Sequence, residues 1–236
     1  MITVTSFERK KKEDWLMKVK FLGHACFQFD DGKYKVLVDP FLTGNPAAAL
    51  GAEEVEADYI FVTHGHGDHI GDAIAIAKRT GAVICTTVDL AETAMAGSGL
   101  EIVAGNIGGT ISFPFGTAKF FQALHGSGAA GTVSCGFIFG IGGRKIYHAG
   151  DTGLTMDMQL LQDEELDAAL LPIGDFYTMG PKDAVRAAQM IQPKVVIPMH
   201  YSTFDHIRQD PEQFVRALEE KELEGIVLKP GEAVEI

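Results

Sequence analysis

The sequence is poor in cysteine, with three in 236 residues. The three stand singly inside apolar runs, and no two have the spacing of a CxxC metal or redox motif. A small thiol inside an apolar run is typical of a buried, unreactive side chain. We therefore interpret Cys26, Cys85 and Cys135 as buried free thiols rather than as a disulfide framework or as metal ligands.

Long apolar runs are also lacking. No run of apolar residues approaches the ~20 that cross a bilayer. The N-terminal lysines are not followed by the apolar segment and small residues of a signal peptide. We therefore expect a soluble cytoplasmic protein that does not associate with membranes.

Basic residues are few compared with acidic ones. The chain has 20 Lys and Arg against 32 Asp and Glu, which gives a formal net charge of −12. Its one basic stretch, residues 9–12, is flanked by acidic side chains. Binding to a phosphate backbone needs a basic surface. The expected partner is therefore a small-molecule substrate and not a nucleic acid, and a homo-oligomer stays open because composition does not reveal an apolar interface.

Glycine, in contrast, is abundant. The 27 glycines fall between short apolar runs, a pattern typical of many strands joined by tight loops. Strand-like and helical segments mix in both halves of the chain, which predicts an α/β fold. We expect a single domain over residues 17–236, preceded by an N-terminal extension at residues 1–16. Strands are expected at 17–22, 26–29, 34–38, 59–63, 82–86, 117–124, 133–140, 144–149, 167–172, 194–199 and 225–228, and helices at about 70–79, 88–96, 155–162, 181–191 and 211–220.

The most informative stretch is residues 63–69, Thr-His-Gly-His-Gly-Asp-His. It offers three imidazoles and one carboxylate, the ligand types that zinc and similar cations prefer. The intervening glycines adopt backbone angles closed to other residues, so the ligands can turn toward different ions. An apolar run before the stretch places His64 at the carboxyl end of a buried strand. We expect His64 and His66 to face one ion, and Asp68 and His69 to face a second.

Three further side chains stand where a loop leaves a predicted strand. His125, Asp151 and His200 each follow an apolar run, and at one rim of a sheet sandwich they would complete two sites. His125 joins the first site, His200 joins the second, and Asp151 bridges them. We therefore expect two divalent ions per chain, with zinc favoured, while manganese, iron and nickel stay open because the same ligand types bind all four.

This ordered set of ligands resembles the metallo-β-lactamase fold superfamily, and the resemblance runs from Met17 to the carboxyl end. Several segments are similar to small metal-dependent hydrolases akin to L-ascorbate-6-phosphate lactonase: Gly23-His24-Ala25-Cys26-Phe27, Val38-Asp39-Pro40, Tyr147-His148-Ala149-Gly150-Asp151-Thr152 and Pro198-Met199-His200-Tyr201. The resemblance implies a four-layer αββα sandwich with the site on one rim. It implies the same ligands as the spacing does.

A dinuclear site predicts a hydrolase. Two cations about 3.5 to 4 Å apart lower the pKa of a shared water, so that a metal-bound hydroxide can attack a carbonyl or phosphoryl group. Asp68 is the expected catalytic residue, because it would orient that hydroxide. The expected substrate is a small anionic ester, lactone or phosphoester. The alternatives are a phosphodiesterase or nuclease of the same fold, an iron-dependent oxidoreductase, and a binding protein with a vestigial site.

Four more side chains are expected around the metals, as substrate contacts or as support for the ligands. The resemblance places His24 near the ions, and Asp39 could anchor a ligand imidazole through its distal nitrogen. His148 is expected as support on a neighbouring strand, and Tyr177 lies in a predicted pocket loop. A purely structural role stays open for each of them. His206 is expected to be exposed to solvent.

Overall fold

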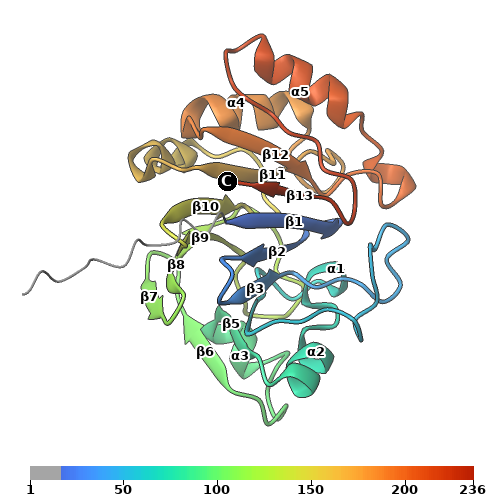
Figure 1. Ribbon diagram of the computed structural model, residues 1–236, viewed down its shortest axis with the longest axis vertical. Coiled ribbons are helices and arrows are strands. Elements are labelled where there is room, and N and C mark those ends of the chain that lie inside the picture. The colour runs from blue at the N-terminus through green and yellow to red at the C-terminus, as the bar shows by residue number, and fades with distance from the viewer. Residues whose placement is uncertain (1–16) are drawn as a thin grey trace, which may run out of the picture.

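A computed structural model describes residues 17–236 of the chain. The N-terminal extension expected at residues 1–16 lies outside the described residues. Within residues 17–236, thirteen strands form two mixed sheets that pack face to face (Figure 1). The expectation of a single domain over this range stays a prediction.

The first sheet consists mainly of the N-terminal half of the chain. Its spatial order is β13-β1-β2-β3-β4-β5-β6, antiparallel as far as β3 and parallel from β3 to β6. The C-terminal strand therefore returns to pair with the first one. The strands are β1 (Lys18–Gly23), β2 (Cys26–Asp30), β3 (Lys35–Val38), β4 (Tyr59–Phe61), β5 (Val83–Thr87), β6 (Ile102–Gly105) and β13 (Ala233–Glu235).

The second sheet is built by the C-terminal half. Its order is β12-β11-β10-β9-β8-β7, antiparallel from β7 to β10 and parallel from β10 to β12. The parallel strands β3, β11 and β12 are buried on both faces, as strands covered by helices must be. The strands are β7 (Thr110–Phe113), β8 (Gly116–Gln122), β9 (Cys135–Ile141), β10 (Arg144–His148), β11 (Ala168–Pro172) and β12 (Val195–Met199).

Helices cover the outer face of each sheet. Figure 1 shows α4 and α5 beyond β11 and β12 at one end of the molecule, and α2 and α3 beyond β5 at the other. The four layers confirm the predicted αββα sandwich. None of the helices within residues 17–236 is long and apolar enough to cross a membrane. The helices are α1 (Gly67–Ile70), α2 (Ala73–Thr80), α3 (Val88–Glu92), α4 (Pro181–Ile191) and α5 (Pro211–Glu219), with 3₁₀ segments η1 (Met156–Glu164) and η2 (Asp205–Ile207).

Successive side chains of a strand point to opposite faces of the sheet, and this divides the buried apolar residues into two clusters. In β3, Val36 and Val38 point into the cluster between the sheets, whereas Leu37 points toward the helices outside. Phe61 of β4 faces inward in the same way, and its neighbour Ile60 faces outward. Both faces of the first sheet are therefore apolar, and the sheet is fixed between the second sheet and its own helices.

The two longest C-terminal helices begin where the sequence signals a start. Pro181 is the first residue of α4 and follows Gly180, and the helix ends at Ile191 as predicted. In α5, Pro211 again comes first, and the Asp210 carboxylate accepts hydrogen bonds from two backbone N–H groups of the first turn. These caps satisfy donors that the helix itself leaves unpaired.

The structure departs from the predicted elements at several places. The helix expected over 70–79 is divided by Gly71, because the next N–H, of Asp72, donates to the Pro40 carbonyl oxygen. The helix expected over 155–162 is a 3₁₀ segment. The strand expected at 225–228 is wrong, since the chain makes a single bridge to β12 there and pairs later with β1. Three short strands, β6, β7 and β13, were not predicted.

Candidate metal centre

All seven side chains expected as metal ligands lie at one rim of the sandwich, in three groups that each bring their ligand atoms within 4.8 Å of one another. Both sheets contribute to this cluster, because the strands that precede the ligands end at the same rim. Ligands follow β4, β8, β10 and β12, and others stand in α1 and in the residue before it. We refer to the seven residues as the ligand cluster: His64, His66, Asp68, His69, His125, Asp151 and His200.

The first group consists of His64, His66 and His125. His64 Nε2 and His66 Nδ1 are 2.9 Å apart, and the His125 ring stands edge-on to both imidazoles at 5.1 Å. His64 Nδ1 lies 2.9 Å from the Thr63 hydroxyl, which itself donates to the carboxylate of Asp39. That hydroxyl must accept from His64 Nδ1, so the lone pair of His64 Nε2 is directed into the group.

Two imidazoles of this group, those of His64 and His125, are neutral at neutral pH. Burial, reinforced by the neighbouring His69, lowers the pKa of His64 to about 2. Burial also lowers the pKa of His125, although Asp151 acts in the opposite direction. Neutral imidazole is the form that binds metal ions, so this group is prepared for a cation rather than for an anion.

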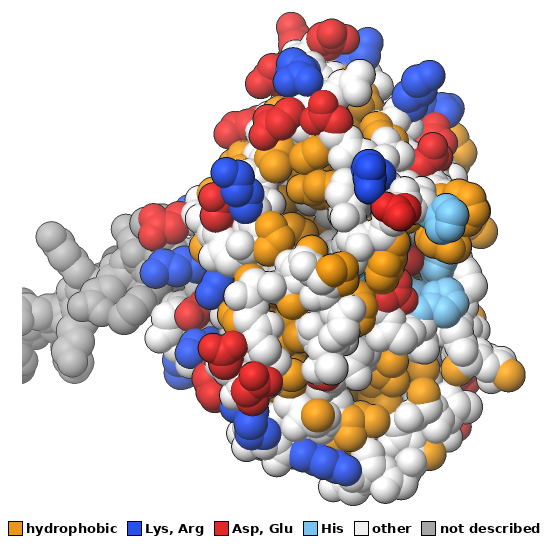
Figure 2. Space-filling view, turned by 90° about the vertical axis from the view of Figure 1, so that its right-hand side faces the viewer, with side chains coloured by type: hydrophobic (Ala, Val, Ile, Leu, Met, Phe, Trp, Pro, Cys, Tyr) orange, Lys and Arg blue, Asp and Glu red, His pale blue; other side chains and the backbone are white. Residues whose placement is uncertain are grey.

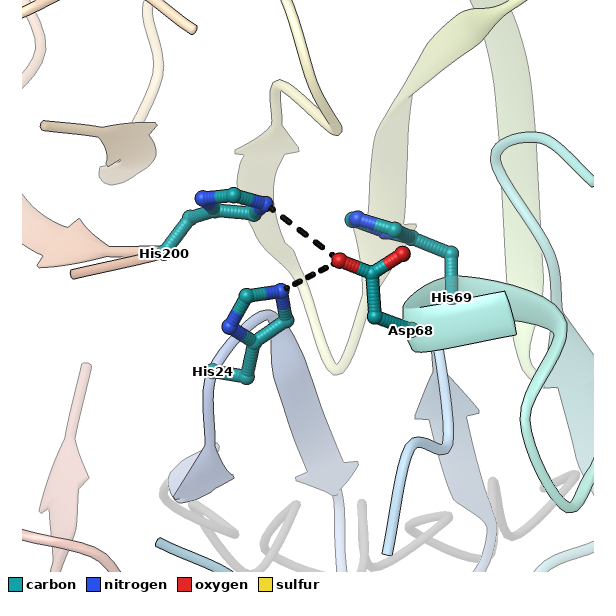
Figure 3. Close-up of side chains that lie close together, drawn as sticks. All are labelled: His24, Asp68, His69 and His200. Atoms are coloured by element: carbon teal, nitrogen blue, oxygen red, sulfur yellow. Dashed lines mark hydrogen bonds and ion pairs between the residues drawn. The ribbon is translucent and has the colours of Figure 1, made fainter. Parts of the chain in front are cut away.

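The second group contains Asp68, His69 and His200, with His24 as an additional member (Figure 3). Asp68 Oδ2 lies 3.2 Å from His24 Nε2 and 3.9 Å from His200 Nε2. The rings of His69 and His200 are parallel to within 17°, with centroids 5.5 Å apart. The carboxylate therefore points between imidazoles that come from different sheets.

Asp151 lies between the two groups. One carboxylate oxygen is 3.3 Å from His69 Nε2, and the other is 3.4 Å from His125 Nε2 and 3.1 Å from His200 Nε2. The side chain is almost completely buried. Asp151 thus faces members of both groups, the position expected for a bridging ligand.

The polar atoms of this cluster fit divalent cations. Among residues 17–236, His69 Nε2, Asp151 Oδ1 and both ring nitrogens of His200 are buried without a hydrogen-bond partner of acceptable geometry. A buried polar atom left unpaired costs about 1 to 3 kcal/mol. His69, Asp151 and His200 each direct one such atom toward other members of the cluster, and imidazole with carboxylate is a donor set that suits zinc and related ions.

Asp39 orients the His69 imidazole through a hydrogen bond to its Nδ1 atom. Its Oδ2 accepts hydrogen bonds from His69 Nδ1 at 2.8 Å and from the Thr63 hydroxyl at 2.7 Å, and its Oδ1 accepts from the Thr63 backbone N–H. Burial opposes ionisation of Asp39, but His69 outweighs it and holds the pKa below its ordinary value. With Nδ1 donating to a carboxylate, His69 directs Nε2 toward Asp151.

His24 holds Asp68. It lies in the turn between β1 and β2 with a φ of 60°, and its ring nitrogens contact the Thr203 hydroxyl at 2.9 Å and Asp68 Oδ2 at 3.2 Å. Burial lowers the pKa of His24 to about 4, which leaves a single N–H at neutral pH. When Nε2 donates to Asp68, Nδ1 accepts from Thr203. The ring is buried, so His24 contacts a member of the ligand cluster and does not line the cavity.

His148 stands further from the cluster than His24. Its Nε2 donates to the Ala25 carbonyl oxygen at 2.9 Å, and its Nδ1 accepts from the Gly150 N–H at 3.2 Å. Gly150 has a φ of 60°, and a Cβ there would lie 2.8 Å from the Cys135 carbonyl oxygen. His148 and Gly150 together shape the tight turn that precedes Asp151.

A cavity of about 450 Å³ opens onto the ligand cluster. Tyr177, as expected, lines it, and Phe204 and His206 line it as well. His206 is exposed, as the sequence indicates, but its ring also stacks on Phe176 at 5.1 Å. Figure 2 shows histidine side chains at one edge of the molecule beside hydrophobic and acidic ones. Sequence reasoning missed Phe204 and the cavity role of His206; their only signal was a place within six residues of His200.

Comparisons with known proteins agree with this geometry. Residues 18–200 match the family described as Beta-lactamase superfamily domain. A UPF0173 metal-dependent hydrolase of Thermus thermophilus is 48% identical over 225 residues, which are 94% of this chain and 100% of that protein. Another, of Symbiobacterium thermophilum, is 48% identical over 92% of this chain and 98% of its own length. Among solved structures, the metallo hydrolase Igni18 of Ignicoccus hospitalis superposes with a TM-score of 0.87 at 34% identity, covering 93% of this chain and 98% of that one.

Proposed function

The chain belongs to the metal-dependent hydrolases of the β-lactamase superfamily, and we propose that it cleaves an ester, lactone or phosphoester bond with two divalent cations. One cation would be held by His64, His66 and His125, and the other by Asp68, His69 and His200. Asp151 would contact both. When bound, such a pair of cations supplies a water of lowered pKa as nucleophile and positive charge for the reacting oxygen.

The observation that carries this proposal is the position of Asp151. Its two oxygens face different imidazoles, Oδ1 toward His69 and Oδ2 toward His125 and His200. Oδ1 and the facing His69 nitrogen have no hydrogen-bond partner within the described chain. A single ion would need only one of the two groups, whereas a carboxylate set between them favours two ions.

Asp68 is the residue best placed to act on the attacking water. It is part of the ligand cluster, and it also lines the cavity, with 29% of its side chain exposed. Burial opposes its ionisation, but the hydrogen bond from His24 and the charge of His69 hold its pKa well below the ordinary value. Asp68 is therefore a carboxylate at neutral pH, able to orient a water and to accept its proton.

His24 acts through Asp68. Its Nε2–H fixes the position of one carboxylate oxygen, and the Thr203 hydroxyl fixes the ring in turn. His24 follows β1 of the first sheet, whereas Thr203 lies in the loop after β12 of the second, so the ring that holds the carboxylate is itself fixed by a contact between the two halves of the fold. Such support keeps a reacting group within the narrow range of positions that catalysis needs.

The test combines metal content with turnover. Protein purified without chelator should contain about two zinc, manganese, nickel or iron ions per chain by elemental mass spectrometry, and should hydrolyse members of a panel of esters, lactones and phosphoesters. Asp68→Ala should lose turnover by at least about a thousandfold while keeping its circular dichroism spectrum. Asp163→Ala, at an exposed carboxylate of η1, is the matched control.

Two results would contradict the proposal. One is wild-type turnover in Asp68→Ala. The other is a chain that retains no metal after purification and takes up none when it is added back. A protein with bound iron that consumes oxygen and hydrolyses nothing would move the site to oxidative chemistry.

A further inference from the structure

Aromatic side chains line the cavity beside the ligand cluster. Phe176 is 65% exposed, Tyr177 is 52% exposed and Phe204 is 39% exposed. Large aromatic side chains normally bury most of their surface, and a group of them left open beside a reactive site marks a place for a ligand. Tyr177 and Phe204 line the cavity directly, and Phe176 is in contact with Tyr177 and with His206.

These rings are held in place by contacts with other aromatic rings. Phe176 meets Tyr177 edge to face at 4.8 Å and stacks on His206 at 5.1 Å with an interplanar angle of 24°. Phe204 stands edge-on to the buried His24 ring at 5.6 Å. Two segments therefore meet here, the loop after β11 and the loop that contains η2 after β12. We call these four residues the ring wall: Phe176, Tyr177, Phe204 and His206.

Neither lysine nor arginine is among the residues of the described chain that line the cavity. Arg208, on the same loop as His206, is bound to Asp205 at 2.7 Å. Proteins recognise a phosphate or carboxylate chiefly with arginine, lysine or backbone N–H groups. A negative charge lying against the ring wall would face aromatic rings instead.

We propose that the substrate rests an uncharged, planar apolar group, such as an aryl ring, against the ring wall while its scissile bond faces the ligand cluster. This assignment rests on the proposed function and narrows it to esters and lactones that carry such a ring. It departs from the anionic substrate expected from the sequence, because the lining offers an anionic group neither lysine nor arginine. A cavity of about 450 Å³ is large enough for one ring and the reacting group.

Hydroxamates test this assignment, because the metal-binding group stays constant while the rest of the molecule changes. We would titrate the zinc-loaded protein with acetohydroxamate, benzohydroxamate and phosphonoacetohydroxamate by calorimetry. Benzohydroxamate should bind about tenfold more tightly than acetohydroxamate, a factor that ring stacking and burial can supply. The phosphonate should bind no more tightly than acetohydroxamate.

Variants of the ring wall test which residues cause the preference for benzohydroxamate over acetohydroxamate. Phe176→Ala and Tyr177→Ala should keep acetohydroxamate affinity and lose most of the tenfold preference for the ring. Leu160→Ala is the matched control, because Leu160 is 64% exposed, much as Phe176 is, but lies at a different cavity, away from the ring wall. Equal affinities for the three hydroxamates, or tightest binding of the phosphonate, would overturn the assignment.

The ring wall can also be tested apart from catalysis. Saturation-transfer NMR with methyl benzoate on metal-free protein should show binding in the wild type and in Leu160→Ala, and a loss of signal in Phe176→Ala. Absence of the signal from the wild type would overturn the ring assignment. A protein that shows the signal but neither binds metal nor hydrolyses any ester would instead overturn the proposed function.

Discussion

The backbone N–H of His200 donates a hydrogen bond to the carbonyl oxygen of His24 over 2.7 Å. Their rings lie 4.0 Å apart, and both residues have left-handed backbone angles, with φ of 54° and 60°. Such a conformation costs a non-glycine residue about 1 to 2 kcal/mol. Because His24 follows the first strand and His200 follows β12, the bond joins the two sheets at the site. The strained pair is maintained where two distant parts of the chain must hold ligands together.

We expect Asp39→Asn to weaken metal binding. The substitution removes the charge that His69 Nδ1 contacts at 2.8 Å, so the ring is less firmly oriented and its Nε2 is a poorer ligand. The affinity for one of the two ions should fall by about 10- to 100-fold, with the other little changed. Competition with a fluorescent zinc chelator measures both affinities.

The control for this change is Asp163→Asn, which removes an exposed carboxylate of η1 and should leave both affinities at wild-type values. Circular dichroism should be the same for all three proteins. Unaltered zinc affinity in a folded Asp39→Asn protein would mean that Asp39 contributes only to packing.

Asp167 gives a prediction about stability and pH. It accepts a hydrogen bond from the Lys145 backbone N–H at 2.8 Å and another from Lys194 Nζ at 2.7 Å. Burial opposes ionisation, but these donors outweigh it and lower the pKa of Asp167 below its ordinary value of 3.8. The folded protein therefore favours the carboxylate. This stabilisation is present above the pKa of the unfolded chain and is lost as pH falls through the lower folded pKa.

Asp167→Asn should accordingly lower the free energy of unfolding by about 1 kcal/mol at pH 7. The difference from wild type should begin to shrink below about pH 4, where Asp167 of the unfolded chain takes up a proton, and should be lost as pH falls through the lower pKa of the folded protein. Urea titrations of both proteins between pH 7 and pH 2.5 follow this change. A difference that stays constant over the whole range would show that the charge has no part in it.

Phe61 gives a prediction about the contact between the sheets. Its ring, fully buried, meets the rings of Phe113, Phe115, Phe137 and Phe139 at centroid distances of 4.8 to 6.1 Å. Truncation to alanine leaves a cavity and should cost about 3 to 5 kcal/mol of unfolding free energy, with a smaller loss for leucine. Denaturant titration measures both variants. A loss no larger than that of the exposed Phe176→Ala would contradict the packing.

The sequence contained most of the information about the ligand cluster. Each ligand either stands in a dense His and Asp motif or follows an apolar strand, and strand ends of a layered fold meet at one rim. The helix at 181–191 was likewise predictable, because Pro181 and a regular apolar spacing define it. Local sequence patterns were sufficient to predict the motif at residues 63–69 and the helix at 181–191, because the residues that define each of them are close together in the sequence.

Features set by distant contacts were not predictable. The strand β7 alternates between exposed and partly buried residues at a sheet edge, so its apolar signal is weak. The run at 225–228 is apolar because it packs against β12, not because it pairs along its length. Thr203 supports His24 from 179 positions away along the chain. No spacing rule connects residues so far apart.

The ligand cluster is carried by strand ends and by α1, whereas the ring wall is carried by two loops. Loops tolerate changes in sequence and length better than the elements they join. On the proposed assignment, the ligand cluster determines the reaction and the ring wall determines the choice of substrate, so the two properties are inherited through different parts of the chain. On the same assignment, substitutions at residues 175–177 and 204–206 would change the substrate while the reaction itself is preserved.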